Sequence, residues 1–151
     1  MRKFSIVSVN VSEDKGVSKR PVESAVLREG HGVVGDAHAG AGPRQVSLLA
    51  WEDVQEVRAR DIDVGPGDLA ENITTRGVEL ARLPVGTRLL LGEAVLEVTR
   101  IGKECVEGCE IMRAVGDCIM PRRGVFARVL RGGVVSRESA CGYRIGPGGR
   151  G

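Results

Sequence analysis

Four cysteines are the residues of this chain best suited to chemistry: Cys105, Cys109, Cys118 and Cys141. A deprotonated cysteine attacks sulfur and binds soft metals, so each is a candidate nucleophile or ligand. Three residues separate Cys105 from Cys109, and neither a Cys-x2-Cys pair nor a His-x3-5-His pair is present. The spacing therefore disfavours a structural zinc site and leaves reactive thiols or small buried side chains as the alternatives.

Cys105 differs from the other three cysteines in its neighbours. It lies in the segment Gly102-Lys103-Glu104-Cys105-Val106-Glu107-Gly108, whose glycines leave the backbone open. The ammonium of Lys103 favours a thiolate, whereas the carboxylates of Glu104 and Glu107 disfavour one. The local sequence leaves two interpretations open, a reactive thiol and a buried one.

A second group of polar residues lies in the glycine-dense loop from Gly30 to Pro43. Asp36 and His38 are two residues apart, and in an extended backbone such side chains point to the same side. Both can therefore face one pocket, as an acid/base pair or as ligands. Asp and His also commonly hydrogen-bond within turns, so a purely local role is the alternative.

Arginine dominates the basic residues, with 18 arginines against four lysines. The planar guanidinium suits phosphate and other oxyanions. In the segment Met120-Pro121-Arg122-Arg123-Gly124, two arginines precede a predicted strand and can grip a phosphate bidentately. The pair Glu71-Asn72, which follows a glycine turn, can bind a polar ligand. The alternative for the two arginines is a solvated turn. The alternative for Glu71-Asn72 is hydrogen bonding to the backbone of its own loop.

The composition excludes several classes of protein. A net charge of +2 does not indicate bulk binding to nucleic acid or to a membrane surface. No stretch approaches the ~18 apolar residues of a membrane span. The segment Met1–Val9 lacks the pattern of a signal peptide, so we expect a cytoplasmic protein. In that compartment, four cysteines are expected to be thiols rather than a disulfide framework.

Short strands are the elements that must position these residues. One helix is predicted over Trp51–Arg60, where Trp51, Val54 and Val57 recur at a spacing of three. The turn Gly92-Glu93 predicts one hairpin, and Arg131-Gly132-Gly133 predicts another. Alternation and β-branched content predict strands at Phe4–Val11, Val22–Leu27, Arg44–Leu49, Thr87–Leu91, Ala94–Thr99, Gly124–Leu130 and Val134–Ser136.

The pattern as a whole predicts a mainly β fold. Seven or eight short strands and 22 glycines indicate many turns and a closed or nearly closed sheet. The length of 151 residues suits a single domain, which we place over residues 1–145. Residues 146–151 are expected to form a flexible Gly/Arg tail.

Six segments, taken together and in order, resemble the MOSC domain, the module also found at the C-terminus of molybdenum-cofactor sulfurases. The resemblance spans roughly residues 5–135 and is closest to the small stand-alone bacterial type. The segments are Gly32-Val33-Val34-Gly35-Asp36-Ala37-His38, Arg44-Gln45-Val46-Ser47-Leu48-Leu49, Gly67-Asp68-Leu69-Ala70-Glu71-Asn72-Ile73-Thr74-Thr75, Leu83-Pro84-Val85-Gly86, Ile101-Gly102-Lys103-Glu104-Cys105-x3-Cys109, and Pro121-Arg122-Arg123-Gly124-Val125-Phe126-Ala127-Arg128-Val129.

The resemblance implies a MOSC-type β-barrel of short strands with one or two short helices. It also implies a pocket in which one cysteine carries sulfur or ligates molybdenum, and Cys105 matches that cysteine. Glu104 and Val106 stand where relatives often have Pro and His. Cofactor binding is accordingly expected from Asp36, His38, Arg44, Asn72, Lys103 and Arg122.

The function implied is a protein of molybdenum-cofactor metabolism. It would carry sulfur as a persulfide on Cys105, as a possible sulfurtransferase, or bind molybdenum cofactor there. The expected partner is a cysteine desulfurase, which alone would hold pyridoxal phosphate, or a molybdenum-cofactor biosynthesis protein. Two alternatives remain: a molybdenum-cofactor-dependent reductase of N-hydroxylated compounds in which Cys105 ligates molybdenum, and a non-catalytic module that binds a cofactor or a partner.

Overall fold

The computed structural model describes residues 2–14, 17–101 and 123–146 of the chain. The expectations placed on Cys105, Lys103 and Arg122 lie outside the described residues, as does the tail beyond Gly146. Asp36, His38, Arg44 and Asn72 lie within them.

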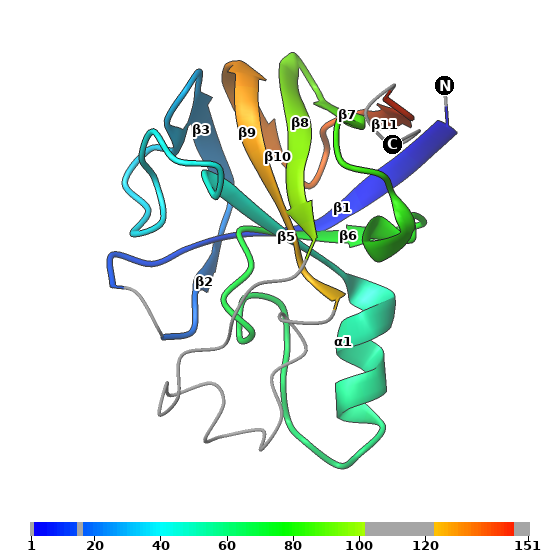
Figure 1. The fold of residues 1–151 in the computed structure, drawn as a ribbon. Coiled ribbons are helices and arrows are strands. Elements are labelled where there is room, and N and C mark those ends of the chain that lie inside the picture. The colour runs from blue at the N-terminus through cyan, green and yellow to red at the C-terminus, as the bar shows by residue number, and fades with distance from the viewer. Residues whose placement is uncertain (1, 15–16, 102–122, 147–151) are drawn as a thin grey trace.

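A closed sheet is the main feature of the fold (Figure 1). Among the described residues, seven strands form a ring in the order β1-β6-β5-β9-β8-β7-β11, and β11 pairs back with β1. The mainly β barrel predicted from the sequence is confirmed, and closure leaves these strands without open edges. The strands are β1 (Arg2–Val11), β5 (Val46–Ala50), β6 (Ile73–Arg76), β7 (Arg88–Leu91), β8 (Ala94–Ile101), β9 (Val125–Arg131) and β11 (Cys141–Arg144).

The long strand β1 closes the ring because successive parts of it pair with three different strands. It pairs with β11 through Arg2–Phe4, with β6 through residues 5–9, and with β2 (Arg20–Val22) through residues 9–11. Its register with β6 shifts between Ile6 and Ser8. Such an irregularity bends a strand and increases its twist, which lets β1 pass from one neighbour to the next.

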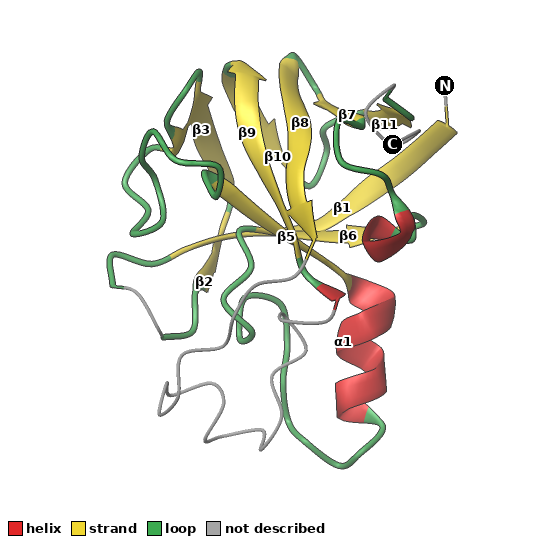
Figure 2. Ribbon diagram, in the orientation of Figure 1, coloured by secondary structure: helices red, strands yellow, loops and turns green. Residues whose placement is uncertain are grey.

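The helix α1 (Trp51–Arg58) connects β5 to β6 and extends from one end of the barrel (Figures 1 and 2). β5 and β6 are parallel, and parallel neighbours require a crossover connection of this kind. Val54 and Val57 are buried and pack with Leu49 and Phe126. The predicted helix is confirmed to within two residues at its C-terminus. A short 3-10 turn, η1 (Leu80–Arg82), precedes β7.

A small second sheet has the order β10-β3-β4 and lies outside the ring. Its strands are β3 (Ser24–Arg28), β4 (Gly32–Val33) and β10 (Gly133–Ser136). The predicted β9–β10 hairpin is wrong, because β10 pairs with β3. Gly132 allows this pairing, since a Cβ at that position would lie 2.5 Å from the carbonyl oxygen of Leu27.

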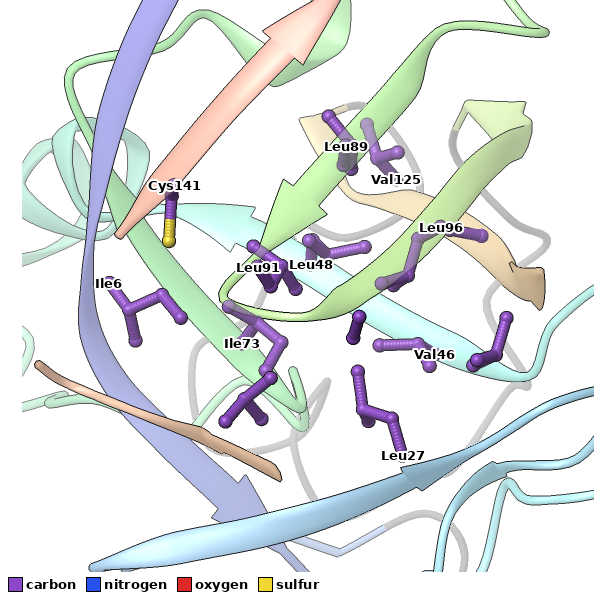
Figure 3. Close-up of a cluster of buried hydrophobic side chains, with 14 of the residues drawn as sticks. Ile6, Leu27, Val46, Leu48, Ile73, Leu89, Leu91, Leu96, Val125 and Cys141 are labelled. Carbon is purple, nitrogen blue, oxygen red and sulfur yellow. The ribbon is translucent and has the colours of Figure 1, made fainter. Parts of the chain in front are cut away.

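The barrel interior is filled by aliphatic side chains from the ring strands and β3, and Cys141 points into it (Figure 3). The Cys141 thiol donates a hydrogen bond to the Ser139 carbonyl at 3.3 Å. Burial raises the pKa of this thiol to about 11, so it stays protonated at neutral pH. Cys141 is therefore a core residue rather than a reactive thiol.

No helix among the described residues is long and apolar enough to cross a membrane.

Candidate functional site

Lys19, in the loop between β1 and β2, joins the two residues that sequence spacing had paired. Its side chain is fully buried, and its Nζ lies 2.9 Å from Oδ1 and 3.1 Å from Oδ2 of Asp36. The same Nζ lies 2.9 Å from Nδ1 of His38. These three residues, which we name the Lys19 cluster, bring together a cation, an anion and an imidazole.

Asp36 also fixes the glycine-dense loop against the end of β1. Its Oδ1 accepts the backbone N–H of Ser12 at 2.9 Å, and its Oδ2 accepts the backbone N–H of His38 at 3.0 Å. Burial would raise the pKa of Asp36, but contacts with His38, with Lys19 and with the Ser12 amide hold it well below its usual range. The carboxyl is therefore ionised at neutral pH. Asp36 thus shows both the local bonding and the clustering that its sequence setting allowed.

His38 is the member of the Lys19 cluster that reaches the surface. Its side chain is 19% exposed, whereas those of Lys19 and Asp36 are 0% exposed. Its Nδ1 is 3.7 Å from Oδ2 of Asp36, farther than from Nζ of Lys19. A ligand approaching from solvent would thus meet the imidazole before it met either charge.

Asn72, immediately before β6, ties β1 to β5. Its side-chain oxygen accepts the N–H of Ser47 at 3.0 Å and the Ser47 hydroxyl at 3.1 Å. Its side-chain nitrogen donates to the carbonyl of Asn10 at 3.2 Å. Asn72 is 0% exposed, so in this conformation its amide positions the strands. The predicted contact between Asn72 and a cofactor stays a prediction.

Glu71, the neighbour of Asn72, is a fully buried carboxyl. Its Oε2 accepts the Gly67 N–H at 3.0 Å and the Thr74 hydroxyl at 2.6 Å, whereas its Oε1 is buried without a hydrogen-bond partner among the described residues. Burial raises the pKa of Glu71, and the bonds from Thr74 and Gly67 only partly oppose that shift. The neutral acid is therefore favoured more strongly at Glu71 than at a glutamate in water. With Asn10, Ser47, Asn72 and Thr74, Glu71 forms what we call the Asn72 network.

Gly67 connects the Asn72 network to the Lys19 cluster. Its carbonyl accepts the backbone N–H of Lys19 at 2.7 Å, and its N–H donates to Glu71. Its φ is +86°, and a Cβ at this position would lie 2.2 Å from the Lys19 carbonyl oxygen. The glycine turn predicted before Glu71 is therefore the point where two loops, far apart in sequence, come into backbone contact.

Arg44, the remaining described candidate, lies just before β5. Its guanidinium carbon is 5.6 Å from the centroid of the Phe126 ring, which places the cation over an aromatic face. Arg44 is partly exposed, and its side chain makes no recorded hydrogen bond or ion pair within the described ranges. The guanidinium can therefore receive an anionic ligand.

Two large surface clefts are formed by described residues, and Asp36 and His38 line neither of them. One, of about 580 Å³, lies beside the start of α1, and the other, of about 610 Å³, lies against β8 and β9. Arg123 lines the first cleft and binds Oδ1 of Asp53 through its Nε at 3.0 Å. One arginine of the predicted phosphate grip is thus engaged by a carboxylate.

The part of the chain that the structure describes contains no cluster of metal-binding side chains. No three His, Cys, Asp or Glu side chains there come together to hold an ion. Sequence reasoning found Asp36 and His38 but missed Lys19 and Asn10, which lie in no motif, and did not single out Ser47 within the segment Arg44–Leu49. The sequence pattern marked Glu71 as a candidate beside Asn72, but it did not predict that the Glu71 carboxyl is buried.

Comparison with known proteins gives one family and several similar folds. The family model described as "MOSC domain" matches residues 35–140. The YuaD protein from Bacillus subtilis is similar in structure, with a TM-score of 0.77 and 19% identity over 93% of this chain and 95% of that one. YiiM from Escherichia coli gives a TM-score of 0.69 and 18% identity over 95% and 70% of the two chains.

A second YiiM structure, from Geobacillus stearothermophilus, gives a TM-score of 0.70 and 18% identity over 93% of this chain and 75% of that one. At these identities the likeness is one of fold. A search of curated proteins finds no match.

Proposed function

Because the chain belongs to the MOSC domain family, we propose that it is a protein of molybdenum-cofactor metabolism that carries sulfur as a persulfide on Cys105. The family as a whole is associated with molybdenum cofactor. The observation that carries the proposal is the family match over residues 35–140, which includes Asp36, His38 and Cys105 in one unit.

The barrel supports this proposal through the strands that flank the Cys105 segment. The described chain leaves the barrel at Ile101, four residues before Cys105. Ile101 pairs with Val125, and Val125 pairs with Leu48. Leu48 adjoins the serine that holds Asn72. The point of departure toward Cys105 therefore lies at the end of the barrel that carries the Asn72 network.

A persulfide suits this role because sulfur transfer between thiols needs no external redox partner. The Cys105 thiolate would attack the terminal sulfur of a persulfide on a cysteine desulfurase. A new S–S bond would form at Cys105 while the bond to the donor cysteine breaks, and the donor would leave as a thiolate. Pyridoxal phosphate would belong to the desulfurase.

Molybdenum cofactor is the second expected ligand, and the described residues fit its phosphate better than its metal. The Arg44 guanidinium and the exposed edge of His38 can each contact an oxyanion. No group of three His, Cys, Asp or Glu side chains that could hold a metal occurs among the described residues, and the resemblance to the family implies Cys105 as the protein ligand to molybdenum. When bound, the cofactor would supply a metal centre for electron and oxygen-atom transfer.

The test is to incubate the protein with a cysteine desulfurase and cysteine, and to map the products by mass spectrometry. We expect Cys105 to gain the mass of one sulfur atom, and Cys105→Ser to gain none there. Cys141→Ala is the matched control, because its buried thiol has a pKa of about 11 and should not take part. Sulfur on Cys109 or Cys118, with Cys105 unchanged, would contradict the assignment.

The alternative functions predict different outcomes in a second measurement. Protein purified from a host that makes molybdenum cofactor should contain little molybdenum if it is a sulfur carrier. Stoichiometric molybdenum that is lost in Cys105→Ser would instead favour a reductase of N-hydroxylated compounds. Full cellular function of Cys105→Ser would favour a non-catalytic binding module.

A further inference from the structure

We propose that Lys19 is a positioning residue of the candidate site, and that its ammonium holds His38 in the tautomer with the proton on Nε2. The solvent-facing side of the imidazole is then a hydrogen-bond donor. The use of this donor toward an anionic ligand rests on the proposed function, but the tautomer does not.

The distances around His38 decide which nitrogen carries the proton. A lysine ammonium can only donate hydrogen bonds, so a nitrogen 2.9 Å from Nζ must accept one. The acceptor is Nδ1, and a neutral imidazole with a lone pair on Nδ1 carries its proton on Nε2. The competing arrangement has Nδ1–H donating to Asp36, but that contact is 3.7 Å, beyond the usual N–H···O range.

The charge on Lys19 follows from its contact with Asp36. The Asp36 carboxylate has both oxygens within 3.1 Å of Nζ, and neither side chain is exposed. A neutral Lys19 would leave a buried carboxylate without its counter-ion, which is strongly unfavourable. Backbone N–H groups of Ser12 and His38 also donate to this carboxylate and favour its ionised form. Lys19 is therefore an ammonium, and it donates to Nδ1.

This arrangement narrows the chemistry open to His38. With Nδ1 occupied by Lys19, that nitrogen is available neither as a general base nor as a metal ligand. Nε2–H can donate to an acceptor, and an acceptor that carries negative charge gives the stronger bond. The ligand class that fits is therefore an anion such as a phosphate oxygen or a sulfur anion. Among the roles considered from the sequence, this arrangement favours one in which Nε2–H of His38 donates a hydrogen bond.

The tautomer can be measured directly because the chain has only two histidines. In His31→Gln the spectrum contains His38 alone, and side-chain nitrogen NMR distinguishes Nδ1–H from Nε2–H. We expect the Nε2–H form in this background and a mixture after Lys19→Gln is added. An Nδ1–H form with Lys19 present, or an unchanged tautomer in folded Lys19→Gln, overturns the proposal.

Lys19→Arg keeps the experiment decisive if Lys19→Gln does not fold. The guanidinium retains the charge and can donate to both neighbours, so we expect a single Nε2–H form to persist. A folded Lys19→Arg protein with the Nδ1–H form would overturn the proposal. A purely structural role for Lys19 would change stability without moving this signal.

The donor role has its own readout, the rate at which Cys105 acquires sulfur. Gln at position 38 can place an amide N–H near the Nε2 position, whereas Asn is too short to do so. We expect His38→Gln to keep most of the rate and His38→Asn to lose about tenfold, the scale of a hydrogen bond to a charged group. Equal rates in both overturn the donor role. Failure of Cys105 to load in any variant overturns the proposed function but leaves the tautomer assignment standing.

Discussion

Two buried carboxyls of the site, Asp36 and Glu71, have pKa values shifted in opposite directions. Both are removed from water, which by itself raises a carboxyl pKa. Asp36 has the His38 side chain, the Lys19 ammonium and two backbone N–H donors around it, and its pKa is lowered. At Glu71 the effect of burial dominates, and its pKa is raised. Their contributions to stability should therefore respond to pH with opposite signs.

Asp36→Asn tests the lowered pKa. A carboxyl whose folded pKa is depressed adds stability above its ordinary pKa, and that stability is lost as pH falls through the folded value. We expect the variant to lose about 3–5 kcal/mol at neutral pH, because the substitution removes the carboxylate of a buried ion pair. Its unfolding free energy should depend less on pH than that of the wild type below about pH 4.

Urea unfolding at a series of pH values measures both quantities for Asp36→Asn. Asp63→Asn, at an exposed position, is the control for loss of one negative charge. Parallel acid profiles for wild type and Asp36→Asn would show that the Lys19 contact does not depress this pKa.

Glu71→Gln tests the raised pKa. A carboxyl whose folded pKa is raised adds stability below its ordinary pKa, and that stability is lost as pH rises through the folded value. The difference in unfolding free energy, variant minus wild type, should therefore increase as pH rises above the ordinary glutamate pKa of about 4.3. We expect an increase on the scale of an unsatisfied buried group, about 1–3 kcal/mol. Thermal unfolding at each pH measures this difference, and Glu56→Gln, at an exposed position on α1, is the control. A difference in unfolding free energy between Glu71→Gln and wild type that stays constant with pH would contradict the raised pKa.

At the residue scale, the spacing of two predicted that Asp36 and His38 lie on the same side of one loop, and Nδ1 of His38 lies 3.7 Å from Oδ2 of Asp36. Their predicted contact with a cofactor stays a prediction. Lys19 is 17 residues from Asp36, and the contact depends on how two loops pack. A single lysine in a polar segment is expected at the surface, because lysine is almost never fully buried unless it is paired. The sequence around Lys19 does not identify such a partner, so it could not predict the burial.

At the scale of elements, Gly67 is the residue where the two loops of the site touch. Gly35 gives a matched comparison, since its φ is +87° against +86° for Gly67. A Cβ on Gly35 would have nothing within 4 Å, whereas one on Gly67 would lie 2.2 Å from the Lys19 carbonyl oxygen. The pair therefore separates backbone strain from steric exclusion.

Gly35→Ala should cost about 1–2 kcal/mol, the strain of a left-handed backbone for a residue with a Cβ. Gly67→Ala should cost clearly more, because Lys19 or Gly67 must also move. We expect the excess to be accompanied by changes in the His38 and Lys19 NMR signals. Equal losses of unfolding free energy in the two variants would mean that the loops separate without cost.

Strands were predictable wherever alternation was long enough to read. β1, β8 and α1 follow from periodicity in eight or more residues each. β4 has two residues and β11 reads Cys-Gly-Tyr-Arg, so neither carries a pattern. The partner of β10 depended on the close approach of Gly132 to Leu27, a tertiary contact that overrides the local hairpin signal.

At the scale of the whole molecule, the barrel is closed by strands from opposite ends of the described chain. Arg2, Lys3 and Phe4 pair with Tyr143, Gly142 and Cys141. Phe4 and Cys141 also belong to the buried cluster that fills the barrel. Opening this seam would expose the core, so β1 and β11 should separate only when the whole ring unfolds.

Native-state hydrogen exchange measures this cooperativity strand by strand. Amides in the β1–β11 seam should exchange with the same free energy as those of β5 and β6, close to the global unfolding value. The sheet β10-β3-β4 should open at lower free energy, because it lies outside the ring and Val26 and Val134, paired across it, are 50% and 60% exposed. If the seam instead exchanges at the lower free energy of β3 and β10, the ring is not one cooperative unit. The Lys19 cluster is anchored by Ser12 just beyond β1, so amides of the glycine-dense loop should follow the ring rather than the small sheet.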